Sequence, residues 1–458
     1  MLTENRGFQE KLHIVTIEDL VPQEHYLRKL EAAIDFSFIY DEVRDYYCPN
    51  NGRPGIDPVV IIKYLLIGYL DGIESERRIE REIQVNMAYR WFLGLDIDDR
   101  VPDHSTISQL RRRKFNNTNL FRRLFERVLA LCIGKGLVDG KVILTDSTHV
   151  KANASRRSET KVLVEKEAAW YMERLDRHEA LERERLEQAG KIKPKQIRKT
   201  DSAEPALLEK SISTTDSEAG FLQRPGKPQG MHYLDHQSVD AKNGIIVDVA
   251  VTAGNVHDAA PYLDRIEYMT EKLGLEIETV GVDSAYDVSL IHQELAEKNI
   301  RLITPANKNQ PRYKVEFSKG AFMYDASEDV FICPAGRILR LYGLQNSVNN
   351  VSREYRADPK GCKTCQLREK CLAASQNCRR IQVNIFEASV KRNHEGDGTP
   401  EHLEVLRLRQ IWCEGRFASQ KAHHNLRRLL RWGLEAAESH CLLSATAMNL
   451  KRMIRCLG

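Results

Sequence analysis

The chain has 458 residues, a charged fraction of 29% and a formal net charge of +4. This length predicts two or three domains with a sizeable core, and so mild a positive charge does not by itself establish nucleic-acid binding. The start, Met1–Glu10, is polar and has no apolar signal segment, and the apolar stretch Val59–Leu70 is too short to span a bilayer. A cytoplasmic protein with no membrane partner is therefore expected.

Residues 1–136 predict an all-helical N-terminal domain. Pro58–Leu70 and Ser75–Leu95 carry apolar residues at helical spacing and few strand signals. Asn117–Ile133 predicts one more helix, which is closed by glycines.

A basic helix is expected after the short acidic loop that ends at Asp103. Thr106 and Gln109 fit a capping box, in which Thr106 caps the first turn and Gln109 reaches back to it. Such a helix can be the second helix of a DNA-binding helix-turn-helix, and an ordinary amphipathic helix is the alternative. In the DNA-binding interpretation Ser108 and Gln109 contact base edges, and the basic run grips phosphates: Arg111, Arg112, Arg113 and Lys114.

Two further basic clusters extend this electrostatic footprint for phosphate, although solvated helix faces would explain each of them alone. The first consists of Lys191, Lys193, Lys195, Arg198 and Lys199. The second, near the C-terminus, consists of Arg427, Arg428, Arg431, Lys451, Arg452 and Arg455.

Residues 137–310 predict an α/β region. The expected order is one strand, a hairpin across an Asn-Gly turn, and two β–α alternations, which matches a ribonuclease-H-like core. The segments are Lys141–Thr145 (strand), His232–Asp240 with Ile245–Thr252 (hairpin), Asp258–Leu273 (helix), Glu278–Val282 (strand), Ser289–Lys298 (helix) and Arg301–Thr304 (strand).

An insertion, residues 155–230, interrupts this core after its first strand. Lys161–Leu186 is rich in Glu, Arg, Leu and Ala and predicts a long charged helix. A solvated strut is favoured over a short coiled coil for this helix. Residues 188–230 contain Pro, Ser, Thr and Gly and predict mostly irregular structure.

A second insertion, residues 311–395, holds half of the ten cysteines. Cys333 ends a short predicted strand, Val330–Ile332, and is followed by Cys362-x2-Cys365-x5-Cys371. Four such thiolates predict a closed, structural Zn²⁺ site, with Cys378 as a rival for one position and a set of free thiols as the alternative.

Three acidic residues lie where a two-metal site would need them. Asp146 and Asp283 each follow a short apolar, strand-like run, and Glu414 lies in a run of helix formers within residues 396–458, the expected C-terminal helical part of the core. Glu414 and Lys421 are separated by close to two helical turns and therefore share a face. Carboxylates of this kind suit two hard divalent cations. Chance is the alternative, because the chain has 65 acidic residues.

Several motifs follow one another in a characteristic order, and in this order the chain resembles bacterial insertion-sequence transposases of the DDE superfamily, in the branch with a Cys-rich insertion before the catalytic Glu. The resemblance covers most of the chain. The motifs include Gly52-Arg-Pro-Gly-Ile-Asp-Pro58, Arg90-Trp-Phe-Leu-Gly94, Val101-Pro-Asp-His-Ser-Thr-Ile-Ser108, Leu144-Thr-Asp-Ser-Thr-His-Val-Lys-Ala152, Val256-His-Asp258, Asp283-Ser-Ala-Tyr-Asp287 and Cys333-Pro-Ala-Gly336.

The resemblance implies an enzyme that cuts DNA at the ends of its element and joins the freed 3′-hydroxyl to target DNA. It also implies that Asp146, Asp283 and Glu414 hold two Mg²⁺ (or Mn²⁺), that Lys421 holds a DNA phosphate, and that a homodimer or higher oligomer acts on the DNA. Two rivals stay open: a metal-dependent nuclease without strand transfer, and an inactive, transposase-derived DNA-binding protein.

The C-terminal motif departs from the family pattern Tyr-x2-Arg-x3-Glu-x6-Lys. Arg407 stands at the Tyr position and Gln410 at the Arg position, whereas Glu414 and Lys421 are retained. Arg409, beside Gln410, is the candidate to serve in place of the missing Arg.

Overall fold

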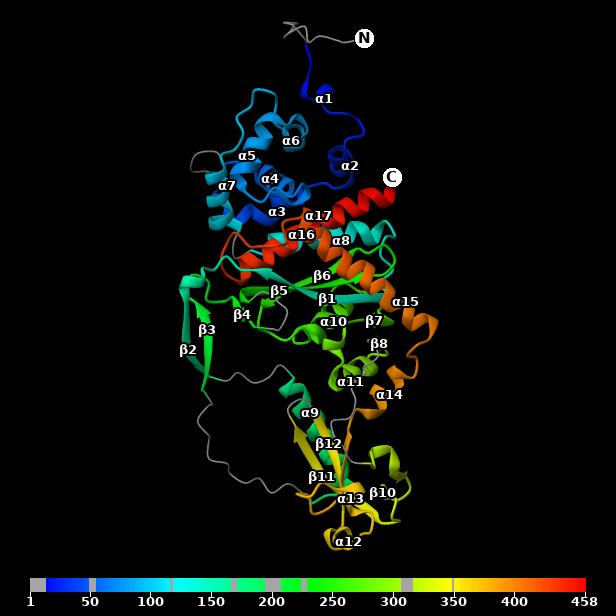
Figure 1. Ribbon diagram of the computed structural model, residues 1–458. Helices are drawn as coiled ribbons and strands as arrows, with labels where there is room; N and C mark the ends of the chain where they lie inside the picture. The colour runs from blue at the N-terminus through cyan, green and yellow to red at the C-terminus, as the bar shows by residue number, and fades with distance from the viewer. Residues whose placement is uncertain are drawn as a thin grey trace, which may run out of the picture.

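The computed structural model describes residues 14–48, 55–115, 118–165, 171–193, 207–223, 229–305, 316–347 and 350–458. The molecule is elongated, with a helical part at one end, a mixed sheet in the middle and a second sheet at the other end (Figure 1). Several sequence features named above lie outside the described residues: Met1–Glu10, the start of the Gly52 motif, and Lys195, Arg198 and Lys199.

The described part of residues 1–136 contains helices and no strand, as expected. Asp57 accepts a hydrogen bond from Val59 N at 2.7 Å and Pro58 takes the first helical position, so α4 begins where predicted. The helix predicted over Ser75–Leu95 is two helices, because Asn86 caps the second. The elements are α1 (Ile17–Leu20), α2 (Tyr26–Ala33), α3 (Phe38–Val43), η1 (Arg44–Tyr46), α4 (Pro58–Leu70), α5 (Glu76–Val85), α6 (Met87–Leu93), α7 (His104–Leu110), the π-helical turn η2 (Arg111–Phe115) and α8 (Leu120–Gly134).

The central sheet is six-stranded, in the order β4-β5-β1-β7-β8 with β6 paired to β5. Strand β5 is antiparallel to β1 and β6, and β7 and β8 run parallel to β1, so the predicted strand, hairpin and β–α alternations are confirmed. Gly244 at the hairpin has φ +64°, which an Asn-Gly turn favours. The elements are β1 (Val142–Lys151), β4 (Gly220–Leu222), β5 (Gly230–Asp240), β6 (Ile246–Ala253), α10 (Tyr262–Glu271), β7 (Thr279–Gly281), η4 (Ser284–Tyr286), α11 (Ser289–Glu297) and β8 (Arg301–Ile303).

Four C-terminal elements pack on this sheet: α15 (Pro400–Arg409), η6 (Gln410–Glu414), α16 (Gly415–His423) and α17 (Leu434–Leu457). A Cβ atom at Gly281 would lie 2.6 Å from Val405, so the glycine lets α15 approach β7 closely. The Asn449 side chain on α17 bonds both the N–H and the C=O of Ile246, at 2.9 and 2.8 Å. Helix α17 also contacts α8 and α4, and it thereby joins the helical end to the sheet.

The first insertion differs from its prediction. Glu159–Glu165 is a strand, β2, paired with β3 (Leu207–Ser213), so the predicted helix is wrong over its first residues and the irregular stretch contains strands. β-Branched Thr160, Val162 and Val164 favour the extended backbone there. The remaining helix, α9 (Met172–Gln188), buries Leu175 and Leu186 and packs on β12 of the second insertion, so it is not a solvated strut.

The second insertion is a five-stranded antiparallel sheet in the order β13-β12-β11-β10-β9, with its own small core around Phe331 and Tyr355. The confirmed strand β10 precedes Cys333. The elements are η5 (Lys319–Ala321), β9 (Met323–Asp325), β10 (Val330–Ile332), β11 (Ile338–Ser347), β12 (Asn350–Ala357), α12 (Pro359–Lys363), α13 (Arg368–Cys371), β13 (Arg380–Asn384) and α14 (Glu387–His394).

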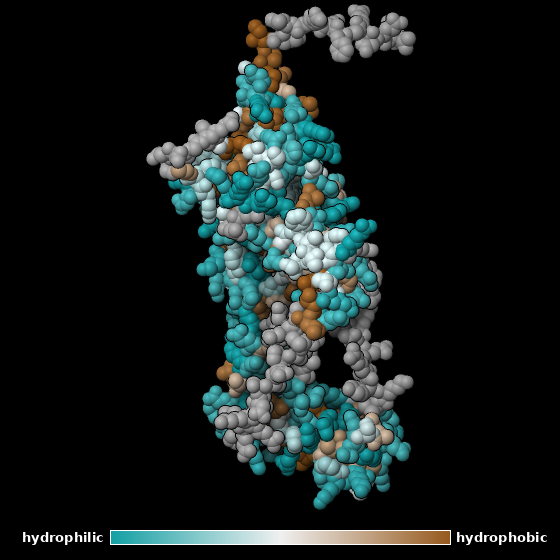
Figure 2. Space-filling model, turned by 90° about the vertical axis from the view of Figure 1, so that its left-hand side faces the viewer, coloured by the Kyte–Doolittle hydropathy of each residue, from teal (hydrophilic) through white to brown (hydrophobic). Residues whose placement is uncertain are grey.

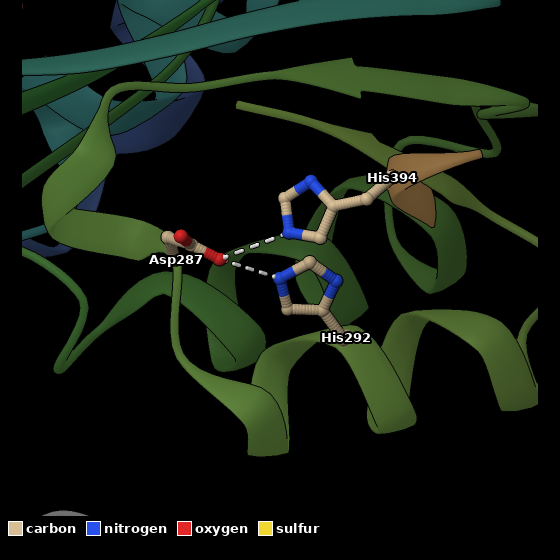
Figure 3. Close-up of side chains that lie close together, drawn as sticks. All are labelled: Asp287, His292 and His394. Carbon is tan, nitrogen blue, oxygen red and sulfur yellow. Dashed lines mark hydrogen bonds and ion pairs between the residues drawn. The ribbon is translucent and has the colours of Figure 1, made fainter. Parts of the chain in front are cut away.

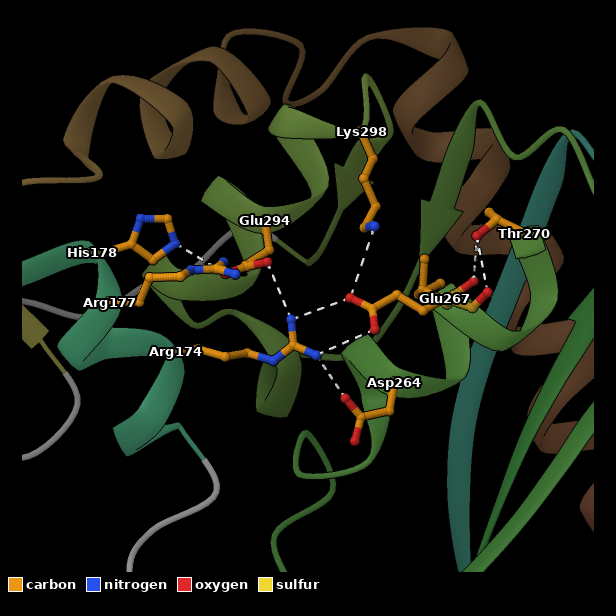
Figure 4. Close-up of polar contacts among 9 residues, drawn as sticks. Arg174, Arg177, His178, Asp264, Glu267, Thr270, Glu294 and Lys298 are labelled. Carbon is orange, nitrogen blue, oxygen red and sulfur yellow. Dashed lines mark hydrogen bonds and ion pairs between the residues drawn. The ribbon is translucent and has the colours of Figure 1, made fainter. Parts of the chain in front are cut away.

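An ion-pair network holds α9 against the central sheet's helices (Figure 4). Arg174 contacts Asp264 on α10 at 2.7 Å and Glu294 on α11 at 3.2 Å, and His178 contacts Glu294 at 3.0 Å. Burial raises the pKa of Glu294, but the His178 hydrogen bond and the charges of nearby arginines outweigh it and leave this pKa below its usual value. The long charged helix therefore links the two insertions to the core.

Most of the face drawn in Figure 2 is hydrophilic. Exposed hydrophobic side chains gather where the described chain begins, with Ile14 98% exposed and Val15 43% exposed. Within the described residues, no helix combines the length and the apolar character needed to cross a bilayer.

Candidate functional site

Strand register brings two of the predicted carboxylates together. Strands β1 and β7 are parallel neighbours in which Leu144 pairs with Gly281. Asp146 and Asp283 each lie two residues after this pair. They therefore lie side by side just beyond the paired part of the two strands. Asp283 then accepts a hydrogen bond from Ala285 N at 2.7 Å, which fixes it at the start of η4.

The pKa of Asp146 is affected by the third carboxylate, Glu414. Burial raises the pKa of Asp146 to about 6, and the charges of Asp283 and Glu414 raise it as well, whereas Arg409 and the Ser147 N–H lower it. Asp283 and Glu414, which lie far from Asp146 in the sequence, are thus close enough in the fold for their charges to act on it.

Glu414 is presented by a π-helical turn, in which Gly415 N donates to Gln410 O. A π-turn stacks residues five positions apart, whereas an α-helix stacks residues four apart. The residue below Glu414 is therefore Arg409 and not Gln410. Arg409 donates to Asp146 Oδ2 at 2.8 Å and to Glu414 Oε1 at 3.4 Å, and its side chain is only 12% exposed.

The two family positions that looked altered in the sequence take no part in this cluster. Gln410 is exposed, and Arg407 is exposed and pairs with Glu404 at 2.7 Å on its own helix. The single extra residue of the π-turn thus places the Arg409 guanidinium beside Glu414. Counting residues at α-helical spacing selects Gln410 and cannot reveal this contact.

Lys421 lies on the same side of β1 as Asp146. Its Nζ donates to Thr148 Oγ1 at 2.6 Å, and Thr148 is two residues after Asp146, so the two strand side chains share a face. Lys421 and Arg409 therefore place two cations around the carboxylates.

Further polar and aromatic residues, which the sequence did not predict to be part of the site, lie near Asp146 and Asp283. Ser147 Oγ donates to Asp258 Oδ1 at 3.0 Å, and the buried Tyr286 packs on Tyr262 with ring centres 4.9 Å apart. The pKa of Tyr286 is raised by burial first and by the charges of Asp258, Asp146 and Asp283 after it. Asp258 and Tyr286 belong to motifs noted in the sequence, but spacing alone gave no contact between those motifs.

The donor set suits hard divalent cations, because it consists of carboxylate oxygens only. Among the described residues, three other groups bring three possible ligand atoms within 4.8 Å of one another: Asp287, His292 and His394; Glu80, Asp103 and His104; His178, Glu294 and Glu297. Asp146, Asp283 and Glu414 are not such a group, since the Arg409 guanidinium lies between two of them and supplies positive charge there.

The four predicted thiols surround one small cavity of about 30 Å³. Cys333 Sγ accepts a hydrogen bond from Arg337 N at 3.3 Å, in a turn where Gly336 has φ +74°. Burial raises the pKa of Cys371, as do the other three thiols, while Arg379 lowers it. Cys333, Cys362, Cys365 and Cys371 thus line one cavity, and the rival Cys378 is not among the described residues that line it.

The capping box predicted for the basic helix is wrong. Asp103 caps α7 and accepts hydrogen bonds from Ser105 N at 2.8 Å and Thr106 N at 3.3 Å, so Thr106 lies inside the first turn. A carboxylate at this position also interacts favourably with the helix dipole, which explains why the helix begins before Thr106.

Only part of the basic run on this helix is available for a phosphate. Arg111 is buried and pairs with Glu76, and Lys114 lies 3.5 Å from the centre of the Tyr47 ring and donates to Tyr46 O at 3.0 Å. The remaining predicted contacts are exposed: Ser108, Gln109, Arg112 and Arg113.

Comparison with known families agrees with this geometry. Residues 15–113 match a family model described as a transposase domain (DUF772), and residues 332–454 match a transposase DDE domain, which includes Arg409, Glu414 and Lys421. The chain belongs to the DDE superfamily of transposases. No curated protein matches this transposase.

Solved transposase structures resemble the chain distantly. A piggyBac transposase synaptic complex with hairpin DNA is 8% identical, and the match covers 94% of this chain and 75% of that chain with a TM-score of 0.37. A Mos1 transposase paired-end complex with the left transposon end is 11% identical and covers 56% of this chain and 61% of that chain, with a TM-score of 0.17. A Mos1 mariner paired-end complex with Mn is 10% identical, covers 60% and 70%, and has a TM-score of 0.16.

Proposed function

We propose that this transposase cuts DNA at the ends of an insertion sequence and joins the freed 3′-hydroxyl to target DNA, with two Mg²⁺ (or Mn²⁺) as cofactors. The observation that supports the proposal is that Arg409 joins Asp146 to Glu414, while Asp283 lies close enough for its charge to act on Asp146. The strand order β6-β5-β1-β7-β8, with β7 and β8 parallel to β1, supports a ribonuclease-H-like core.

Asp146, Asp283 and Glu414 hold the two ions in this proposal. Bound there, the ions lower the pKa of the attacking water or hydroxyl and neutralise the leaving oxygen. Displacement at phosphorus needs little covalent chemistry from the protein, so orientation of the DNA and charge dominate.

Arg409 and Lys421 orient the DNA strand. Arg409 neutralises Asp146 and Glu414, and once these carboxylates held metal ions its planar guanidinium would be available for a bidentate contact with a phosphate. Lys421, on the Asp146 face of β1, contributes a second positive charge to the same phosphate path.

The Cys-rich insertion carries a structural Zn²⁺ in this proposal. The cavity is lined by four thiols and by Arg337, Arg368 and Arg379, whose charges offset that of a four-thiolate site. Because all four positions are taken by protein, the ion has no open position for water and supports the fold only.

Binding to the element ends is assigned to residues 1–136 and above all to the exposed side of α7 and η2. Arg112 and Arg113 grip phosphates there, and Ser108 and Gln109 contact base edges. Oligomerisation on the DNA completes the proposal, because two ends and a target must be held together.

A strand-transfer assay tests the function. We expect purified protein, DNA carrying the element's ends, a target plasmid and Mg²⁺ to yield 3′-end cleavage followed by covalently joined products. Cleavage without joined products would favour the nuclease. Binding without cleavage would favour the inactive DNA-binding protein, although the three carboxylates and Arg409 argue against it.

A further inference from the structure

Asp287, His292 and His394, of which His292 is buried, form a cluster that has no role in the proposed function. Asp287 follows η4, His292 lies on α11 and His394 ends α14 (Figure 3). His292 Nε2 is 2.8 Å and His394 Nε2 is 3.7 Å from the same oxygen, Asp287 Oδ1. His292 is 1% exposed.

Two histidines and one carboxylate can bind a metal ion. Whether this cluster does so depends on which histidine nitrogens carry protons, because a protonated nitrogen cannot bind a metal. Strand β8 is the edge of the central sheet, and Arg301 N donates to Glu278 O on the β7 side. Backbone N–H groups alternate along a strand, so the next one, Leu302 N, points away from the sheet.

The outward N–H of Leu302 fixes the tautomer of His292. Leu302 N donates to Asn393 Oδ1 at 3.4 Å, which turns Asn393 Nδ2 toward His292 Nδ1 at 2.9 Å. Because Nδ1 of His292 accepts a hydrogen bond, its proton lies on Nε2 and points at Asp287. A metal ion on Nε2 would require the opposite tautomer and would leave Leu302 N facing an NH₂ group.

Hydrogen bonds and ion pairs of the cluster connect both catalytic segments, and the contact between Asp287 and His394 is an ion pair at 3.7 Å. Asp283 and Asp287 flank the single turn η4, in which Tyr286 N donates to Asp283 O at 3.2 Å, so a displacement of Asp287 displaces Asp283. On the other side, His394 Nδ1 lies 3.0 Å from Asp397 Oδ2, and Asp397 Oδ1 lies 3.2 Å from His402 Nε2 on α15. Helix α15 ends at Arg409 and leads into the turn that carries Glu414.

We propose that His292 is a positioning residue of the transposase: its Nε2–H holds Asp287, and through η4 it holds Asp283 in register with Asp146, with a proton and not a metal ion at the centre of the cluster. This inference rests on the proposed function, because it assigns Asp283 to the catalytic metals. Groups behind metal ligands commonly change metal affinity or activity by about 10–100-fold when they are removed.

The test measures the Mg²⁺ concentration that gives half-maximal cleavage of end DNA. His292→Leu removes the donor and should raise this concentration by about tenfold. His292→Gln keeps an N–H donor near the Nε2 position and should restore a value close to that of the wild type. An unchanged Mg²⁺ requirement in His292→Leu overturns the proposal.

His178→Leu is the matched control. His178 is also a buried histidine paired with a carboxylate of α11, Glu294, at 3.0 Å, but it lies on the insertion helix α9 and its ring packs on Phe386, with ring centres 5.0 Å apart. It should lower the melting temperature without changing the Mg²⁺ requirement. An equal rise in the Mg²⁺ requirement for both variants would mean general loosening of the fold and would overturn the specific role of His292.

Two further measurements need no destabilised variant. Nitrogen NMR of histidine-labelled wild type should place the His292 proton on Nε2, and a proton on Nδ1 overturns the proposal. The zinc content should be equal in wild type and His292→Gln, and loss of one equivalent would identify a metal site instead. Asp283→Asn separates this inference from the proposed metal site, because continued cleavage by Asp283→Asn would remove Asp283 from the catalytic centre whatever the His292 variants do.

Discussion

The carboxylate centre and the thiol centre are assembled over very different distances along the chain. Asp146, Asp283 and Glu414 come from β1, from the end of β7 and from η6, and they meet only after the sheet and α15 have packed. The four cysteines come from one insertion and line a cavity of about 30 Å³ within it.

The two centres also differ in what fills them. In the carboxylate centre, Arg409 bridges Asp146 and Glu414. A long arginine side chain can be displaced when a cation binds to these carboxylates. The thiol centre is lined by four thiols and three arginines from one insertion, and four thiolates are the ligand set of a structural Zn²⁺. In the proposed function the first centre exchanges its ions during chemistry and the second holds one ion for stability, and the following substitutions can break or sharpen that distinction.

The largest expected effect is on the carboxylates. Asp146→Asn, Asp283→Asn or Glu414→Gln should each slow cleavage by roughly a thousandfold, since an amide is a poor ligand for a hard cation and several kcal/mol of charge stabilisation are lost. End binding and the melting temperature should stay close to wild type. The measurement is single-turnover cleavage in Mg²⁺ and in Mn²⁺, and a near-normal rate for any variant would remove that residue from the site.

The second-largest expected effect is on the cleavage rate of an Arg409 variant, compared with a variant of its neighbour Gln410. Arg409→Ala should slow cleavage by about a hundredfold, comparable to the loss of one fixed donor to a developing charge. Gln410→Ala should have little effect, because Gln410 is exposed and lies outside the cluster. The matched pair tests the π-turn directly. A strong defect in Gln410→Ala with a mild one in Arg409→Ala would mean that the turn relaxes to an α-helix when DNA binds.

The sequence predicted the elements that have a local signal and missed those that depend on contacts between distant segments. The strands of the core were predictable because apolar runs and an Asn-Gly turn mark them locally. The π-turn was not, since one inserted residue leaves no local signal and the α-helical count selects Gln410. The packed face of α9 was missed for a similar reason. Arg174 is one of the charges that make α9 look solvated, and its partners, Asp264 and Glu294, lie in distant segments.

Zinc removal should affect the second insertion and spare the carboxylate centre. We expect one equivalent of Zn²⁺ in protein purified without chelators, and its loss in a Cys362→Ser, Cys365→Ser double variant. Because a thiolate site contributes its binding free energy to folding, amide exchange across β9 to β13 should accelerate by more than about tenfold. Cleavage in excess Mg²⁺ should persist. Protein that carries no zinc under reducing conditions would leave the four cysteines as free thiols.

The smallest expected effect concerns DNA affinity, and it separates exposed from buried arginines on one helix. Arg112→Ala with Arg113→Ala should weaken binding to end DNA and to random DNA alike, by roughly three- to tenfold, and should reduce the slope of log affinity against log salt by about 2. Gln109→Ala should instead lower only the preference for end DNA.

Arg111→Ala is the control on the same basic run. Arg111 is buried against Glu76, so its loss should destabilise the helical part by about 1–3 kcal/mol and leave the salt slope unchanged. Titrations of end DNA and random DNA at several salt concentrations, together with thermal unfolding, measure both quantities. If the Arg112 and Arg113 changes left the salt slope untouched, α7 and η2 would be structural elements and the phosphate contacts of the transposase would lie on another surface.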